Sequence, residues 1–196
     1  FKAVGQLIAG TLIGLSVPAW AGDVSISERS RTYRVSGGTI QAVVKSMKRN
    51  GPVSELHGRR ALAMADYRFS HNIRVKRTGD RCRVADASVN MRIFYVLPRL
   101  SQPKRLNGRD RARWRRINGM IVAHENQHGR YYRRFARDLQ RALRALKPQS
   151  NCARLHQKAR TVRKRLESIS KNRNRRFDRA QYKPFNRRLK RMAPRR

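Results

Sequence analysis

The sequence predicts an α+β fold, with a small antiparallel sheet and one early helix, then a long helix and a second helix antiparallel to it. Two stretches, residues 67–76 and 89–97, alternate apolar and polar side chains with the period of half-buried strands. Residues 110–146 instead repeat apolar side chains at steps of three and four, which is typical of an amphipathic helix. Lys147-Pro148 then breaks the pattern before it resumes.

The early part of the chain predicts a third strand and a short helix. Residues 31–35 alternate enough for a strand, and Thr39 is a suitable N-cap for a helix that begins at Ile40. Asn50-Gly51-Pro52 is expected to end that helix. A turn at residues 78–80 then joins the two alternating stretches into an antiparallel hairpin.

The last helix is expected to begin at Ser150 or Asn151. Residues 171–196 contain twelve basic residues and one acid with few apolar anchors, so we expect a largely disordered tail there. Residues 22–170 would then form a single α+β domain. The expected inward side of the last helix consists of Cys152, Leu155, Ala159, Val162, Leu166 and Ile169.

The N-terminus indicates export. Residues 3–17 are small and apolar, Lys2 precedes them, and Ala19-Trp20-Ala21 matches a signal-peptidase site, so residues 1–21 are expected to be a signal peptide. The run is shorter than the roughly 20 apolar residues of a membrane span, although an N-terminal anchor is the alternative. We expect a periplasmic or secreted protein with no transmembrane span after processing.

The two cysteines are expected to form a disulfide. Cys82 and Cys152 are an even pair in a chain that would reach an oxidising compartment. Two buried free thiols are the alternative.

The composition predicts attraction to polyanions. The chain has 49 Lys and Arg against 11 Asp and Glu, a formal net charge of +38. Such a charge favours an anionic envelope polymer or lipid surface as partner, and export makes nucleic acid an unlikely partner in vivo.

The sequence His124-Glu125-Asn126-Gln127-His128 has the H-E-x-x-H pattern inside the long helix. Two imidazoles four residues apart lie on one helix face and can bind a single Zn²⁺, while Glu125 can activate a water as general base. Both histidines fall on the apolar stripe, where hydrogen-bonded core histidines are the alternative interpretation.

The third zinc ligand is left open by the sequence. The second helix should return so that positions 169–173 lie level with the histidines. Glu167 is close to that level, and Asp178 reaches it only if the chain folds back. His57 or His71 could come from the sheet instead. Tyr131, Tyr132 and His71 are candidates to stabilise an oxyanion.

These features together resemble a bacterial family of unknown function described as predicted secreted zinc-dependent proteases. The resemblance covers most of the chain after residue 21. It rests on Tyr33-Arg34-Val35-Ser36-Gly37, Tyr67-Arg68-Phe69, Cys82, Leu97-Pro98, the His124-Glu125 and His128 motif and Cys152. It implies a zincin-like fold and zinc-dependent peptide-bond hydrolysis.

The sequence departs from this family after Phe177-Asp178. The family tends to continue into a Thr-x-His-Gly segment, whereas here residues 180–183 read Ala-Gln-Tyr-Lys without a histidine. The metal is therefore completed by Asp178, by Glu167 or by no further side chain, and loss of activity with retention of the fold is a further alternative.

Two functions are expected on these grounds. The first is an exported zinc-dependent peptidase acting on a peptide or protein substrate, with His124 and His128 as zinc ligands and Glu125 as general base. The alternative is a non-catalytic cationic module that binds anionic envelope material or another polyanion.

Overall fold

The computed structural model describes residues 24–53 and 58–194, so the expected signal peptide lies outside the described residues. The α+β class is confirmed, with a three-stranded open sheet, a short early helix and two long helices. The elements in chain order are β1 (Val24–Val35), α1 (Ile40–Asn50), β2 (Met64–Thr78), β3 (Arg81–Leu100), a 3-10 turn (Pro103–Arg105), α2 (Gly108–Arg144) and α3 (Cys152–Met192).

The sheet has the order β1-β3-β2 and is mixed rather than wholly antiparallel. The expected hairpin of β2 and β3 is confirmed, whereas β1 pairs with β3 in parallel. The reason is that β1 ends and β2 begins at the same end of the sheet, where Val35 pairs with Leu100 and Met64 with Val96. Because β3 is antiparallel to β2, it must run in the same direction as β1.

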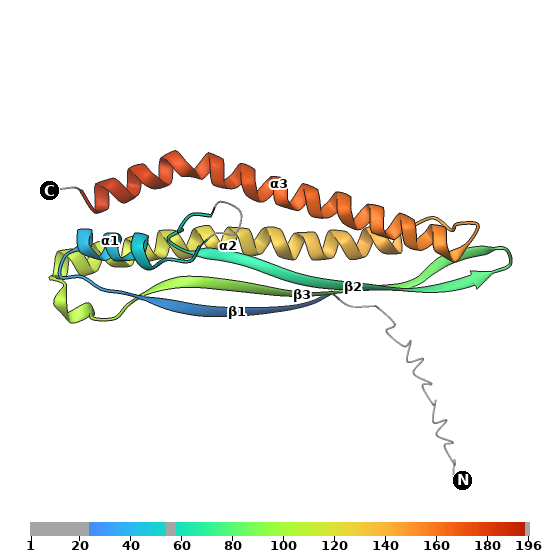
Figure 1. The fold of residues 1–196 in the computed structure, drawn as a ribbon, viewed down its shortest axis with the longest axis horizontal. Coiled ribbons are helices and arrows are strands. Elements are labelled where there is room, and N and C mark those ends of the chain that lie inside the picture. Colours follow the sequence, from blue (N-terminus) through green and yellow to red (C-terminus); the bar gives the residue numbers. More distant parts are fainter. Residues whose placement is uncertain (1–23, 54–57, 195–196) are drawn as a thin grey trace, which may run out of the picture.

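The molecule is built in three layers, with α2 lying along the sheet and α3 lying on α2 (Figure 1). One face of β3 packs on the apolar side of α2 and contributes a series of buried residues at a period of two, the signature of a strand covered on one side. The main core comprises Ala87, Val89, Met91, Ile93 and Tyr95 of β3, Tyr132, Phe135, Ala136, Leu139 and Leu143 of α2, and Ala159 of α3.

The expected disordered tail is wrong, because α3 continues to Met192. Leu189 is buried, and Phe185 and Met192 pack beside it against a second core shared by α1 and the first half of α2. Most of the stability of a helix in a protein comes from tertiary packing, and these three apolar side chains supply it at the end of α3. The expected inward position of Ile169 is also wrong, because this residue is 43% exposed while Ser170 takes the buried position.

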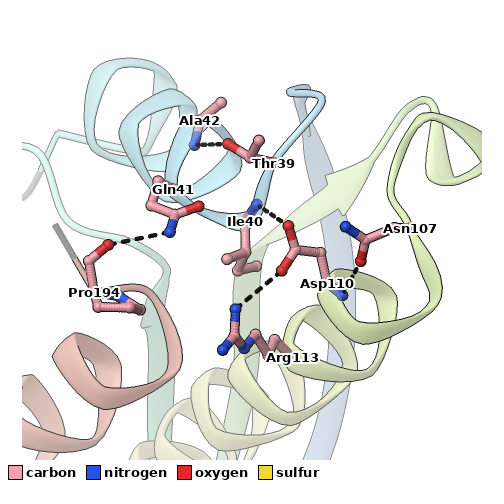
Figure 2. Close-up of polar contacts among 8 residues, drawn as sticks. All are labelled: Thr39, Ile40, Gln41, Ala42, Asn107, Asp110, Arg113 and Pro194. Carbon is pink, nitrogen blue, oxygen red and sulfur yellow. Dashed lines mark hydrogen bonds and ion pairs between the residues drawn. The ribbon is translucent and has the colours of Figure 1, made fainter. Parts of the chain in front are cut away.

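Asp110 joins the beginnings of α1 and α2 (Figure 2). Its Oδ2 accepts a hydrogen bond from the Ile40 backbone N–H at 3.1 Å, and its Oδ1 pairs with Arg113 at 3.2 Å. Because α1 has no acid of its own in its first turn, Asp110 supplies the negative charge that a helix N-terminus favours. Gln41 of α1 also donates to the Pro194 carbonyl, which attaches the end of α3 to the same corner.

The predicted disulfide is confirmed, since Cys82 of β3 is bonded to Cys152 of α3 with their Cα atoms 5.1 Å apart. Cys82 and Gln149 also exchange two backbone hydrogen bonds, so the hairpin tip is connected to the start of α3 both covalently and through the backbone. Among the described residues, none of the helices combines the length and apolar character that crossing a membrane requires.

Candidate metal centre

His124 and His128 lie one helical turn apart on α2 and direct their Nε2 atoms to the same point. The two Nε2 atoms are 3.2 Å apart. His128 is buried and His124 is half-buried. The spacing of four residues on an uninterrupted helix is what brings the rings together, as the sequence predicted.

Asp178 of α3 completes a group of three. Its Oδ1 lies 3.2 Å from the Nε2 of His124 and 2.9 Å from the Nε2 of His128. A tetrahedral zinc with bonds of about 2.0–2.1 Å places its donor atoms roughly 3.3 Å apart. The three donors therefore already form a triangle of nearly the size that one metal ion requires, and they are a group that could hold one.

Asn174 fixes the orientation of His128. The Nδ1 of His128 lies 2.6 Å from the Asn174 Oδ1, and the Asn174 amide in turn donates to the Ser170 carbonyl at 2.9 Å. An amide oxygen can only accept, so Nδ1 carries a proton and donates it to Asn174, which leaves Nε2 as the nitrogen that faces Asp178. Ligating histidines are usually held in this way by a partner at their second nitrogen.

The protonation of the group follows from its contacts. Burial would lower the pKa of His128, but the hydrogen bonds with Asp178 and Asn174 outweigh it and the pKa is raised. Burial would likewise raise the pKa of Asp178, yet the two histidines hold it well below its usual range. Asp178 is therefore a carboxylate at neutral pH, the form that binds metals.

Two aromatic rings of α3 enclose His124. Phe177 stacks on the His124 ring with centroids 4.8 Å apart, and Phe185 approaches it edge-on at 5.8 Å. Phe177 also contacts the rings of His128 and Tyr131. These contacts hold the imidazoles in place, while the Asp178 side chain remains 45% exposed and leaves one side of the group open to solvent.

Glu125 lies beside the histidines but faces the sheet. It is only 7% exposed, and burial raises the pKa of its carboxyl group, which the nearby histidines partly counteract. The backbone N–H of Ala65 of β2 also favours the carboxylate form and so opposes the rise in the pKa of Glu125. A carboxyl group buried in this way, within electrostatic reach of His124, His128 and Asp178, can exchange protons closer to neutral pH than an exposed one.

Gly129, directly after the motif, lets β3 approach α2. A Cβ atom at this position would collide with the hydroxyl group of Tyr95, whose Oη donates to Glu28 at 3.2 Å. Glu28 also pairs with Arg133 of α2. The absence of a side chain at Gly129 therefore sets how closely the helix carrying the histidines lies on the sheet.

Of the alternatives for the third ligand, the structure brings only Asp178 to the histidines among the described residues. Glu167 instead pairs with Arg163 and Lys171 on its own helix. The pKa of His71 is lowered first by burial and then by the charge of Arg163, so His71 lies near Arg163. Arg163 precedes Asn174 by 11 residues, about 16 Å of helix, so His71 is remote from the two histidines of α2. His57 lies outside the described residues.

The predicted position of α3 along α2 was wrong by about one helical turn. The partners of His128 are Asn174 and Asp178 rather than residues in 169–173. The pairing of Gln149 with Cys82 carries the chain past the end of α2 before α3 begins, which a simple antiparallel hairpin does not anticipate.

The three candidates to stabilise an oxyanion, Tyr131, Tyr132 and His71, lie in different surroundings. The Tyr132 hydroxyl donates to the Ala65 carbonyl at 3.1 Å and is occupied there. His71 is remote, as described above. Tyr131 is half-buried beside Phe177, with Arg173 stacked over its ring at 5.8 Å, so it alone of the three lies at the rim of the group.

Fold and site together define an α+β protein with two histidines and one aspartate gathered on its two long helices. The chain belongs to a family described as bacterial proteins of unknown function, DUF922, which it matches over residues 30–183. This range contains the motif and Asp178. No curated protein and no solved structure matches the chain.

Proposed function

We propose that the protein is an exported zinc-dependent peptidase in which His124, His128 and Asp178 bind the metal and Glu125 is the general base. The observation that supports it most is the triangle of donor atoms, 2.9–3.2 Å on each side. Packing alone does not require three donors to converge, whereas a tetrahedral metal does.

Zinc, when bound, would polarise a substrate carbonyl and lower the pKa of a water at its open position. The side chains perform the remaining steps. Glu125 removes a proton from the attacking water, and its raised pKa makes the protonated form accessible. Glu125 then passes that proton to the leaving amine, while Asn174 keeps His128 in the ligating tautomer.

The peptide substrate and the zincin-like fold are proposed from the H-E-x-x-H pattern, in which the carboxylate beside the first histidine is the base of metalloproteases. The periplasmic or secreted location is proposed from residues 1–21 and from the disulfide, because disulfides persist in oxidising compartments.

The second candidate is a non-catalytic cationic module for anionic envelope polymers or lipids. The formal charge of +38 and the exposed cations of α3 favour it. It predicts partner binding without hydrolysis, so the two candidates differ in the outcome of one experiment.

That experiment compares wild type with Glu125→Gln in a digest of a broad peptide library analysed by mass spectrometry. Glu125→Gln should retain fold and zinc, because the side chain keeps its size and no ligand is changed. Hydrolysis should fall by about 100-fold or more, the scale on which a positioned base acts.

Glu167→Gln is the matched control. It removes a carboxylate of the same length on α3, where Glu167 pairs only with Arg163 and Lys171, and should leave hydrolysis unchanged. Equal hydrolysis by wild type and Glu125→Gln would contradict the proposed base, and a loss in Glu167→Gln equal to that in Glu125→Gln would contradict its assignment to Glu125.

A further inference from the structure

The outer side of the second half of α3 carries a row of cations. Five side chains separated by three or four residues lie on one helix face, and all five are exposed. They extend over 14 positions, about 21 Å of helix. The cationic face of α3 consists of Arg176, Arg179, Lys183, Arg187 and Lys190.

This face points away from the rest of the protein. At 100° per residue, its five members lie opposite Asn174, Phe177 and Phe185, which contact α2. α3 is the outermost layer of the molecule (Figure 1). Because the five cations are exposed on its side away from α2, they form a convex ridge rather than the lining of a groove.

No carboxylate of the described chain pairs with these five cations. The two acids of α3 are both engaged elsewhere, Glu167 with Arg163 and Lys171, and Asp178 with the histidines. The ridge is thus a row of charges without internal compensation.

Stability of the isolated chain does not account for this row. Like charges three or four residues apart weaken a helix, and Pro184 within the same segment weakens it further. Phe185 and Leu189 hold the helix in spite of both. An anionic partner would relieve the repulsion along the ridge.

Tyr182 indicates what kind of partner fits. It flanks the cationic face and is 70% exposed, more than any other large apolar side chain described. A tyrosine next to a row of Lys and Arg on a convex ridge is typical of a surface that lies at lipid headgroup level, where the ring is half immersed and the cations meet phosphates.

We propose that the cationic face of α3 and Tyr182 dock the protein on an anionic phospholipid surface. Asp178 lies on the opposite side of the same helix, turned toward His124 and His128 of α2, so docking leaves the candidate metal centre facing α2. Docking does not depend on the zinc proposal, and either can fail without the other.

The test measures partition of the full chain onto phosphatidylcholine vesicles with and without phosphatidylglycerol, at physiological salt. Wild type should bind only the vesicles with phosphatidylglycerol. The triple variant Arg179→Gln, Lys183→Gln, Arg187→Gln should bind them roughly 100-fold more weakly, since each cation near an anionic surface contributes several-fold.

The matched control removes the same charge from the hairpin tip through Lys76→Gln, Arg81→Gln and Arg83→Gln, three exposed cations far from the face. The control should bind nearly as wild type does. An equal loss in both triple variants would overturn the proposal, because net charge alone would then explain binding.

Two other results would also overturn it. One is wild type that does not bind the anionic vesicles. The other is wild type that binds heparin but not the vesicles, which would assign the ridge to a linear polyanion. Circular dichroism checks that each variant keeps its helices.

Discussion

At the scale of single residues, the candidate centre depends on neighbours that orient the histidines. Asn174 fixes the proton of His128, and Phe177 stacks on His124. Gly129 acts through the backbone, because its missing side chain leaves room for the Tyr95 hydroxyl group. The positions of the two histidines therefore depend on contacts of α2 with both α3 and β3.

Gly129→Ala should destabilise the fold by about 1–3 kcal/mol, the usual cost of an added methyl group in a filled space. Urea unfolding followed by circular dichroism measures it. Tyr95→Phe in the same chain should restore part of the loss, because the hydroxyl group is the closest atom to the new Cβ.

Gly119→Ala is the control for helix propensity. It lies on the same helix with nothing within 4 Å of the added atom, so it should stabilise by about 0.5–1 kcal/mol. If Gly129→Ala stabilised as much as Gly119→Ala, the close approach of Tyr95 would be refuted.

At the scale of elements, the strongly periodic segments followed from the sequence. The short helix from Ile40 to Asn50, the hairpin and the long helix were predicted because their apolar residues repeat at a clear period. The end of α3 was missed because its anchors, Phe185 and Leu189, are widely spaced among cations. Its helix depends on a core contributed by α1 and α2, which no local pattern reveals.

The candidate metal centre, like the fold, was predicted only in part from the sequence. The motif identified His124, Glu125 and His128, because helix geometry fixes their relation locally. Asp178 stayed one of several alternatives, because its position depends on the connection between α2 and α3. Asn174 was not identified, and no spacing rule in the sequence indicates it. The direction of β1 likewise depends on where β2 begins rather than on the residues of β1.

Asp110 is the clearest contact between elements. Asp110→Ala should lower stability by about 1–3 kcal/mol, because it leaves the buried N–H of Ile40 without its acceptor. Asp138→Ala on the same helix removes only ion pairs with the exposed Arg134 and Arg141 and should change stability by less than about 1 kcal/mol. Equal losses in urea unfolding of the two variants would contradict the role of Asp110.

At the scale of the whole molecule, the disulfide connects the hairpin tip to α3 at the end opposite the junction of α1 and α2 (Figure 1). Different interactions therefore hold the layers together at their two ends. The Cys82–Cys152 disulfide does so at one end, and the hydrogen bond between Asp110 and Ile40 does so at the other. The candidate metal centre lies between them, bridging α2 and α3.

Reducing the disulfide should lower the free energy of unfolding by roughly 4 kcal/mol, because the bond closes a loop of 70 positions. Urea midpoints with and without reductant measure the loss. The double variant Cys82→Ser, Cys152→Ser should show no response to reductant. A wild-type midpoint that reductant leaves unchanged would contradict the stabilising role of the bond.

The central claim is that one zinc ion is bound by three side chains from two helices, and anomalous diffraction at the zinc edge from crystals grown with zinc tests it most directly. We predict a single strong peak about 2.0–2.2 Å from the Nε2 atoms of His124 and His128 and an oxygen of Asp178. Crystals of Asp178→Ala should lose or weaken that peak. No peak among these three side chains in the wild type would contradict the claim.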